Sequence, residues 1–289
     1  MTLGWVYAIL IFEQILASGT FLAAKWALVE FPALNLAFLR FIIASLGLFL
    51  VQRFWPGRRP VERGDWKHIF LLGFLAVVLN QAFFLYGLKY TTPTHAALLY
   101  GATPVLVFLF AIPLIGEKPT LLKKIGVPVT FLGVAIVITR SGVTWAKDAW
   151  LGDLLILLAV ASWALYTVLG KKLVNKYGAV HLTAMSIIAG TILFAPIGLV
   201  TFTRFDPTSI SVRGWSSLAY IAIGTSVIAY SIWFWALGRL DATKVSVFNN
   251  IQPIVTAIMS YFLLNEPIGP RLIGGGLLVI VGVVLTERG

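Results

Sequence analysis

The chain has 289 residues, of which 59% are hydrophobic and only 11% are charged, and its mean hydropathy is +0.93. A soluble domain of this length carries far more charge, so the composition indicates an integral membrane protein and excludes a soluble domain. The net charge is +11, but no basic soluble module interrupts the apolar sequence, so we expect no nucleic-acid partner. The lack of cysteine excludes disulfides and thiolate metal sites.

The first apolar stretch, "MTLGWVYAILIFEQILASGT", has no positively charged segment before it, so we expect a transmembrane helix and not a cleaved signal peptide. A bilayer-spanning helix needs about 20 mostly apolar residues. The chain divides into ten such stretches, which predicts an all-α polytopic membrane protein with ten transmembrane helices and short polar connections. The predicted helices cover residues 4–28, 33–54, 68–88, 94–115, 121–139, 151–171, 180–203, 214–237, 243–264 and 270–286.

Positive charge is distributed unevenly over these connections. With the N-terminus inside, the cytoplasmic connections, such as "RFWPGRRPVERGDWK", hold twice as many Lys and Arg residues as those on the other side. Since cytoplasmic loops are enriched in Lys and Arg, we expect both termini in the cytoplasm. The lipid bilayer is the environment that this pattern predicts for the chain.

Two segments of the chain resemble each other. "YGATPVLVFLFAIPLIGEKP" can be laid on "NNIQPIVTAIMSYFLLNEPI" without a gap, which pairs Pro104 with Pro253 and Glu117 with Glu266. The chain is therefore predicted to consist of two five-helix halves. Because five is odd, the second half enters the membrane upside down, and such inverted repeats are typical of secondary transporters.

The same register pairs glycines in the last helix of each half. Gly126 falls on Gly275, and Gly133 falls on Gly282. We expect these glycines, together with Gly274 and Gly276, to allow close helix packing and not to bind phosphate.

Through the paired proline and glutamate segments and the glycine-spaced final helix of each half, the chain resembles EamA-type ten-helix members of the drug/metabolite transporter superfamily. The resemblance covers nearly the whole chain and is closest to YddG-type aromatic amino acid exporters. It implies a basket of ten helices around a central cavity, and export of small amphipathic metabolites, aromatic or other amino acids first, across the bacterial cell inner membrane by alternating access. A monomer suffices because both halves share one chain, and we expect no cofactor and no metal. The implied EamA-like repeats are residues 1–140 and 150–289.

Pro104 and Pro253 each lie about 15 Å into a predicted helix, which is near the middle of the bilayer. A proline frees the carbonyl four residues earlier, here at Tyr100 and at Asn249. We therefore expect two kinked helices that face each other, each presenting a polar group and a bare carbonyl to the centre.

Asn249 and Gln252 lie one turn apart on the same helix face and are predicted to bind the substrate. The alternative is that their amides bond neighbouring helices. Asn250 points about 100° away and is more readily explained by such packing. Gln14, Asn80 and Gln81 would complete the polar lining.

Trp163 lies near mid-bilayer and is expected to flank the substrate together with Tyr100, although lipid or helix packing would explain it as well. Trp233 and Trp235 lie close to a helix end and are assigned to the aromatic belt at the membrane interface. His95 and His181, also at helix ends, are interpreted as interfacial and not catalytic.

Glu13 and Arg40 are the costliest residues inside the predicted spans. Their depths differ by only about 6 Å along the membrane normal, so one hypothesis is an ion pair. In the other, Glu13 titrates as a proton-coupling group or binds a substrate ammonium.

Enzyme signatures such as H-E-x-x-H, G-x-S-x-G and the Walker A sequence do not occur, so the chain is predicted not to be an enzyme. The alternative functions are a nucleotide-sugar or drug exporter and, from a different class, a membrane-embedded enzyme or scaffold without recognisable motifs.

Overall fold

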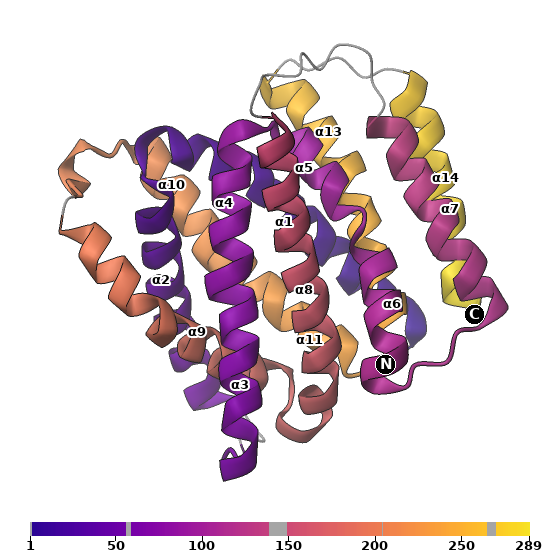
Figure 1. Cartoon of the computed structure of the whole chain (residues 1–289), viewed down its shortest axis with the longest axis horizontal. Helices are drawn as coiled ribbons and strands as arrows, with labels where there is room; N and C mark the ends of the chain where they lie inside the picture. Colours follow the sequence, from indigo (N-terminus) through magenta and orange to yellow (C-terminus); the bar gives the residue numbers. More distant parts are fainter. Residues whose placement is uncertain (1, 56–58, 139–148, 204, 265–269) are drawn as a thin grey trace.

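A computed structural model describes residues 2–55, 59–138, 149–203, 205–264 and 270–289, and every regular element in these ranges is helical (Figure 1). Both termini lie at the same end of the bundle, called the terminal end below; the other end is called the far end (Figure 1). The first half of the chain holds α1 (Leu3–Glu30), α2 (Ala33–Phe54), η1 (Arg63–Asp65), α3 (Trp66–Gly73), η2 (Phe74–Leu79), α4 (Asn80–Tyr90), α5 (Pro93–Tyr100), α6 (Thr103–Ile115) and α7 (Leu121–Ile138). The second half holds α8 (Ala149–Tyr177), α9 (Ala179–Phe202), η3 (Pro207–Ser209), α10 (Val212–Ala219), η4 (Tyr220–Ala229), α11 (Tyr230–Leu237), α12 (Ala242–Val247), η5 (Phe248–Asn250), α13 (Ile251–Leu264) and α14 (Pro270–Arg288).

Seven helical stretches among the described residues are long and apolar enough to cross a membrane. They agree with seven of the predicted spans and identify a multi-pass membrane protein. The other three predicted spans fall on α7, on α12 to α13 and on α14, which do not meet the same criteria over their described residues, so the number ten stays a prediction. The seven stretches are Leu3–Glu30, Ala33–Phe54, Arg63–Tyr90, Pro93–Ile115, Trp150–Tyr177, Ala179–Phe202 and Val212–Leu237.

Several of these stretches change helix type near their middle. The third contains the π-helical segment η2, and the last contains the longer π-helical segment η4. Between α5 and α6 a turn at Gly101 and Ala102 interrupts the helix, and Pro104 occupies the first turn of α6, where a missing N–H costs nothing. Such irregular segments bend a helix and expose backbone or side chains to the space beside it.

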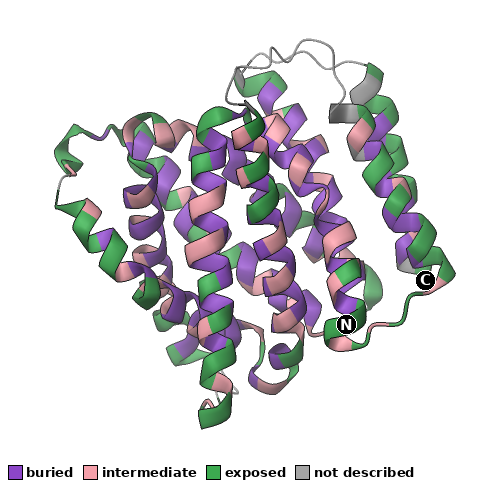
Figure 2. Ribbon diagram, viewed as in Figure 1, coloured by how far each residue is buried: buried purple, intermediate pink, exposed green. Residues whose placement is uncertain are grey.

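The bundle buries polar residues at its centre and exposes apolar ones on its outside. Figure 2 shows buried residues concentrated along the inner faces of the helices and exposed ones on their outer faces. Val29, Phe54 and Val200 are among the apolar side chains left exposed. This distribution suits a protein surrounded by lipid, because hydrocarbon leaves polar groups unsatisfied.

α7 and α14 pack against each other through glycine at two levels. A Cβ atom added to Gly126 would lie 2.8 Å from the carbonyl oxygen of Gly282, and one added to Gly133 would lie 2.6 Å from that of Gly275. The predicted role of these glycines in close helix packing is confirmed. Gly274, in contrast, has open space beside it.

Candidate functional site

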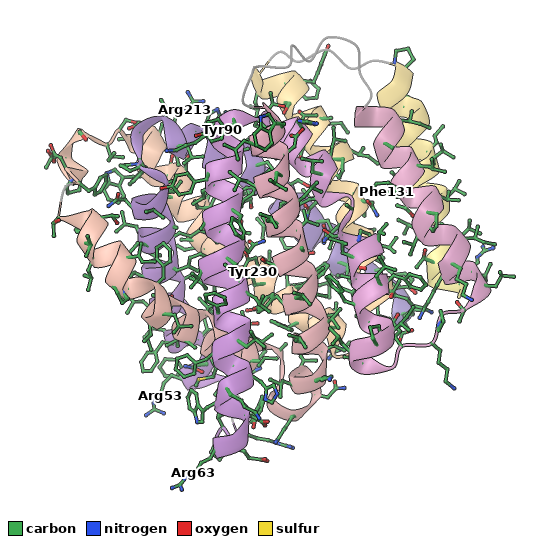
Figure 3. The ribbon with its side chains drawn as sticks, in the orientation of Figure 1. Arg53, Arg63, Tyr90, Phe131, Arg213 and Tyr230 are labelled. Carbon is green, nitrogen blue, oxygen red and sulfur yellow. The ribbon has the colours of Figure 1, made fainter. Side chains whose placement is uncertain are left out.

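A cavity of about 50 Å³ lies between helices of both halves of the chain. It has room for a few water molecules, so a solute the size of an amino acid requires the walls to move apart. Tyr230, at mid-height of the bundle in Figure 3, is one of the lining residues. Among the residues that the structure describes, the lining consists of Glu13, Ala17, Thr20, Phe21, Arg40, Asn80, Gln81, Phe84, Tyr100, Trp163, Thr225, Tyr230, Asn249 and Gln252.

Arg40 from α2 carries the positive charge of this lining and has only 1% of its surface exposed. Its Nε donates to Ser226 Oγ at 2.8 Å, and its Nη1 donates to Gln81 Oε1 at 2.6 Å. The hydroxyl of Tyr230 forms a further hydrogen bond with the guanidinium. All of these partners are neutral, so the charge of Arg40 is solvated by dipoles and not by a carboxylate.

Gln81 and Asn80 connect Arg40 to the neighbouring helices. Gln81 Nε2 donates to Asn80 Oδ1 at 2.6 Å. Asn80 Nδ2 in turn donates to the Tyr100 hydroxyl at 3.0 Å and to the Ala159 carbonyl at 2.8 Å. The orientation of the guanidinium is therefore fixed by a network that reaches from α4 to α5 and α8.

Glu13 from α1 supplies the carboxyl group of the described lining and is 3% exposed. It accepts a hydrogen bond from Gln14 Nε2. Gln14 Oε1 accepts from Gln252 Nε2 at 2.8 Å, and the same nitrogen contacts Asn249 Oδ1 at 3.4 Å. A chain of amides thus links the carboxylate on α1 to the start of α13, across the two halves.

The hypothesis of an ion pair between Glu13 and Arg40 is wrong for this structure. No contact between their charged groups occurs in the part of the chain that the structure describes, because Arg40 bonds Gln81 and Ser226 while Glu13 bonds Gln14. A predicted similarity in depth along the membrane normal does not decide whether two side chains face each other around the bundle axis.

Two groups of aromatic rings line the cavity. In the first, Tyr100 contacts Phe21 and Phe84 edge to face, with ring centroids 5.5 and 5.9 Å apart. In the second, Trp163 packs against Tyr230 at 4.8 Å. An aromatic ligand between these groups would gain edge-to-face or offset-stacked contacts.

Most of the predicted site residues meet in this cavity. Asn249, Gln252, Tyr100, Trp163 and Asn80 line it, and so does Glu13. Gln14 is fully buried behind the lining and contacts Gln252. Asn250 is also fully buried but does not line the cavity, as its position on the helix predicted.

The predicted bare carbonyl at Tyr100 is wrong. The helix breaks before Pro104, and the hydroxyl of Thr103 turns back to donate to the Tyr100 carbonyl at 2.6 Å. On the other half, the N–H of Ile251 donates to the carbonyls of Phe248 and Asn249 within η5. Local capping therefore satisfies the groups that the prolines free.

Sequence reasoning missed Tyr230 and misassigned its neighbour Trp233. Trp233 is 1% exposed, donates from Nε1 to Thr167 Oγ1 at 3.1 Å and packs against Trp163, so the assignment to an interfacial belt is wrong. The run "YSIWFWALG" resembled a belt because several aromatic residues stand near a helix end. The polar residue Ser226, one helical turn before Tyr230, could have indicated that this side of the helix faces the centre of the bundle.

The two histidines lie at helix ends but are not simply interfacial. His95 Nδ1 lies 3.2 Å from Asp153 Oδ1 and 3.0 Å from Thr91 Oγ1. His181 is 6% exposed, and its Nδ1 lies 2.9 Å from Gln52 Oε1. Both therefore join helices together, and among the described residues no group of three or more His, Asp or Glu is arranged to hold a metal ion.

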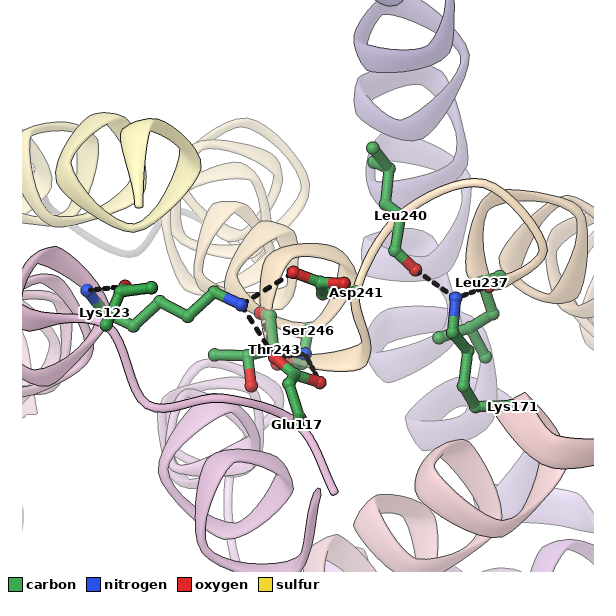
Figure 4. A network of polar contacts seen from close by, with 9 residues as sticks. Glu117, Lys123, Lys171, Leu237, Leu240, Asp241, Thr243 and Ser246 are labelled. Atoms are coloured by element: carbon green, nitrogen blue, oxygen red, sulfur yellow. Dashed lines mark hydrogen bonds and ion pairs between the residues drawn. The ribbon is translucent and has the colours of Figure 1, made fainter. Parts of the chain in front are cut away.

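At the terminal end, an ion cluster joins the two halves of the chain (Figure 4). Lys123 Nζ donates to Glu117 Oε1 at 3.1 Å and to Asp241 Oδ2 at 2.6 Å. Glu117 also accepts from the N–H of Thr243 at 3.3 Å. We call Glu117, Lys123, Asp241 and Thr243 the terminal-end cluster; a cavity of about 550 Å³ opens beside it.

The chain is similar to known transporter sequences over nearly its full length. The model of the EamA-like transporter family matches residues 4–139 and again residues 150–288. An uncharacterized transporter of Archaeoglobus fulgidus is 33% identical over 282 residues, covering 97% of this chain and 96% of that protein. The uncharacterized transporter YyaM of Bacillus subtilis is 30% identical over 287 residues, covering 98% and 93%. A protein chain in a crystal structure is 20% identical in sequence and superimposes with a TM-score of 0.76 over 96% of this chain and 95% of that chain. This similarity supports the fold alone.

Proposed function

Because the chain belongs to the EamA-like transporter family, we propose that this transporter exports small amphipathic metabolites, aromatic amino acids first, across the inner membrane by alternating access. The observation that carries the proposal is the central cavity, which combines two aromatic groups with two buried charges at the junction of the halves. Apolar walls with a few convergent polar groups are typical of small-molecule sites.

Alternating access requires two halves that can exchange conformations, and several features support the proposed inverted repeat. The family model matches each half separately. Lys25 Nζ donates to the carbonyls of Leu88 and Thr91, both at 2.7 Å. In the other half, Lys171 Nζ donates to the carbonyls of Leu237 and Leu240, which are the positions that the repeat register pairs with Leu88 and Thr91.

The helix irregularities follow the same register. The π-helical segments η2 and η4 overlap when Pro104 is laid on Pro253, and so do the break before α6 and the segment η5 before α13. Equivalent irregularities in two halves support the proposal that each half contributes a broken helix to the cavity. We therefore retain 1–140 and 150–289 as the proposed repeats.

The proposed site is formed by Asn249, Gln252, Tyr100, Trp163 and Asn80, with Gln14 behind them. Trp163 and Tyr100 would flank an aromatic side chain, and Asn249 would bond the polar end of the substrate. A nucleotide sugar is a poorer fit, because Arg40 is the one cation among the described lining residues and a diphosphate favours several cations.

Glu13 is the one carboxylate in the described lining, so it is the proposed group for coupling export to protons. A proton and a substrate ammonium would compete for this carboxylate, and such competition would allow the transporter to exchange protons for substrate. Both termini are proposed to be cytoplasmic: Arg53 and Arg63 lie at the terminal end in Figure 3, as the charge rule requires. A monomer holds both halves and is proposed to suffice.

Counterflow in sealed proteoliposomes tests this function. Vesicles that contain the purified protein and a high internal concentration of phenylalanine are expected to accumulate external radiolabelled phenylalanine, whereas protein-free vesicles are not. A membrane-embedded enzyme would convert the labelled compound without accumulating it. Accumulation of a sugar or a drug, with no response to any amino acid, would contradict the proposed substrate.

A further inference from the structure

The central cavity is lined by a guanidinium and a carboxyl group that make no contact with each other in the part of the chain that the structure describes. Arg40 lines one wall, on α2, and Glu13 lines another, on α1. Each forms its hydrogen bonds with neutral side chains, Arg40 with Ser226 and Gln81 and Glu13 with Gln14. An acid and a base that only stabilised the fold would gain most by direct contact, so two such groups that line one cavity without touching call for another explanation.

Arg40 suits an anionic partner. A guanidinium stays charged in proteins, and burial of a cation without an anion is unfavourable. Gln81 and Ser226 hold the group in place, and Gln81 is itself held by Asn80. A planar guanidinium fixed in this way binds a carboxylate in a defined orientation with charge-assisted hydrogen bonds.

Glu13 suits a cationic partner for the matching reason. Its carboxylate is 3% exposed and accepts from Gln14, which is held in turn by Gln252. A carboxylate accepts hydrogen bonds and donates none, so an ammonium group that enters the cavity meets an acceptor of opposite charge.

Tyr230 lines the same cavity, and its hydroxyl bonds the Arg40 guanidinium. Asn249 adds an unused donor, because its Nδ2 is buried and makes no hydrogen bond with any part of the chain that the structure describes. The cavity therefore offers a substrate the guanidinium of Arg40, the carboxyl of Glu13 and the amide N–H of Asn249.

We infer that the cavity recognises a zwitterionic head group, with the substrate carboxylate on Arg40 and the substrate ammonium on Glu13, while Trp163 and Tyr100 contact the side chain. The inference rests on the proposed function and deepens it, because it assigns both poles of an amino acid to residues of this chain. Compounds that carry the same side chain but lack one pole are poor ligands.

Three related ligands test the inference: L-phenylalanine, phenethylamine, which lacks the carboxylate, and 3-phenylpropionate, which lacks the ammonium. Affinities are measured by inhibition of phenylalanine counterflow and by thermal shift of the purified protein. Since a hydrogen bond to a charged group is lost in each truncated ligand, both are expected to bind wild-type protein about 10- to 100-fold more weakly than phenylalanine.

The variants complete a cycle between protein and ligand groups. Arg40→Gln is expected to weaken phenylalanine to the level of phenethylamine and to leave phenethylamine itself unchanged. Glu13→Gln is expected to weaken phenylalanine to the level of 3-phenylpropionate and to leave that acid unchanged. Arg40→Lys keeps the charge and retains the preference for phenylalanine. Arg213→Gln, which removes an exposed arginine packed on Trp26 at the far end, is the matched control and changes none of the three affinities.

Equal affinities of wild-type protein for the three ligands overturn the inference. This comparison uses wild-type protein alone, so it does not depend on whether a variant folds. An equal loss for all three ligands in folded Arg40→Gln overturns it as well. Phenylalanine counterflow with equal affinities removes the head-group assignment and leaves the exporter proposal standing, whereas folded wild-type protein that moves no amino acid overturns both.

Discussion

Replacing Lys123 by methionine removes the ammonium that joins Glu117 in the first half to Asp241 in the second. Methionine keeps the length of the apolar stem, so the change acts mainly through charge. If the terminal-end cluster holds that end closed, the variant is expected to open the central cavity to the terminal side more often.

The magnitude follows from the exposure of the two carboxylates. The side chain of Asp241 is 50% exposed, so its ion pair contributes at most about 1 kcal/mol. Glu117 is 8% exposed and would keep only the N–H of Thr243, which costs about 1.5 to 3 kcal/mol. A combined loss of about 2.5 kcal/mol changes the ratio of open to closed protein by about 70-fold.

Thiol labelling measures this ratio cleanly because the chain contains no cysteine. Ala17 lines the cavity, so Ala17→Cys supplies one reactive group there. A charged, membrane-impermeant maleimide added on the terminal side is expected to react tens of times faster when Lys123→Met is also present.

Lys171→Met is the matched control for that experiment. Lys171 lies beside the same cavity at the terminal end, but its hydrogen bonds go to carbonyls of its own half, and it attracts Glu117 and Asp241 without bonding them. This variant is expected to lower thermal stability and to raise the labelling rate far less than Lys123→Met does. An unchanged rate in Lys123→Met, or an equal rise in both variants, would refute the reasoning that the cluster is a gate.

Three further predictions follow from the same contacts. Burial is the largest influence on the pKa of the Asp241 carboxyl and raises it, but the hydrogen bond from Lys123 and the positive charges of Lys123, Lys244 and Lys171 together outweigh burial and hold that pKa below its usual value. The stability that this carboxylate adds is present above about pH 4 and is lost as pH falls through the lowered pKa, so Ala17→Cys labelling should stay constant from pH 5 to 8. At saturating phenylalanine, Glu13→Gln is expected to retain counterflow but to lose stimulation by a pH gradient, and wild-type stimulation in a folded variant would end the coupling role. Gly133→Val is expected to lower the melting temperature, because its Cβ would lie 2.6 Å from the Gly275 carbonyl, whereas Gly274→Val, with open space beside it, serves as the control.

The positions of the helices were predictable from sequence because lipid demands long apolar stretches, and seven of the predicted spans reappear as such stretches. The π-helical segments were not predictable. "LAVVLNQ" contains no residue that breaks an α-helix, and the π-helical segment follows directly after the close approach of Gly73 to Gly190 on α9. Local sequence carries no record of that contact.

The candidate site was predictable where polar or aromatic residues interrupted an apolar stretch far from the predicted helix ends. Asn249, Gln252 and Trp163 were found in this way and line the cavity. Tyr230 was missed because it belongs to an aromatic run at the end of a predicted helix. The spacing of Glu13 and Arg40 along their helices predicted similar depths, but the direction of each side chain around the bundle axis depends on packing and was not predictable.

The central claim is that the cavity between the two halves holds the substrate, with Trp163 against its side chain and Asn249 at its polar end. Counterflow affinities for phenylalanine and threonine in Trp163→Ala and Asn249→Ala test it most directly. We expect Trp163→Ala to weaken phenylalanine selectively, since stacking adds about 0.5 to 1.5 kcal/mol beyond area burial, and Asn249→Ala to weaken both ligands by about 1 to 3 kcal/mol. Equal losses for the two ligands in Trp163→Ala, or unchanged affinities in Asn249→Ala, would contradict the claim and place the substrate elsewhere.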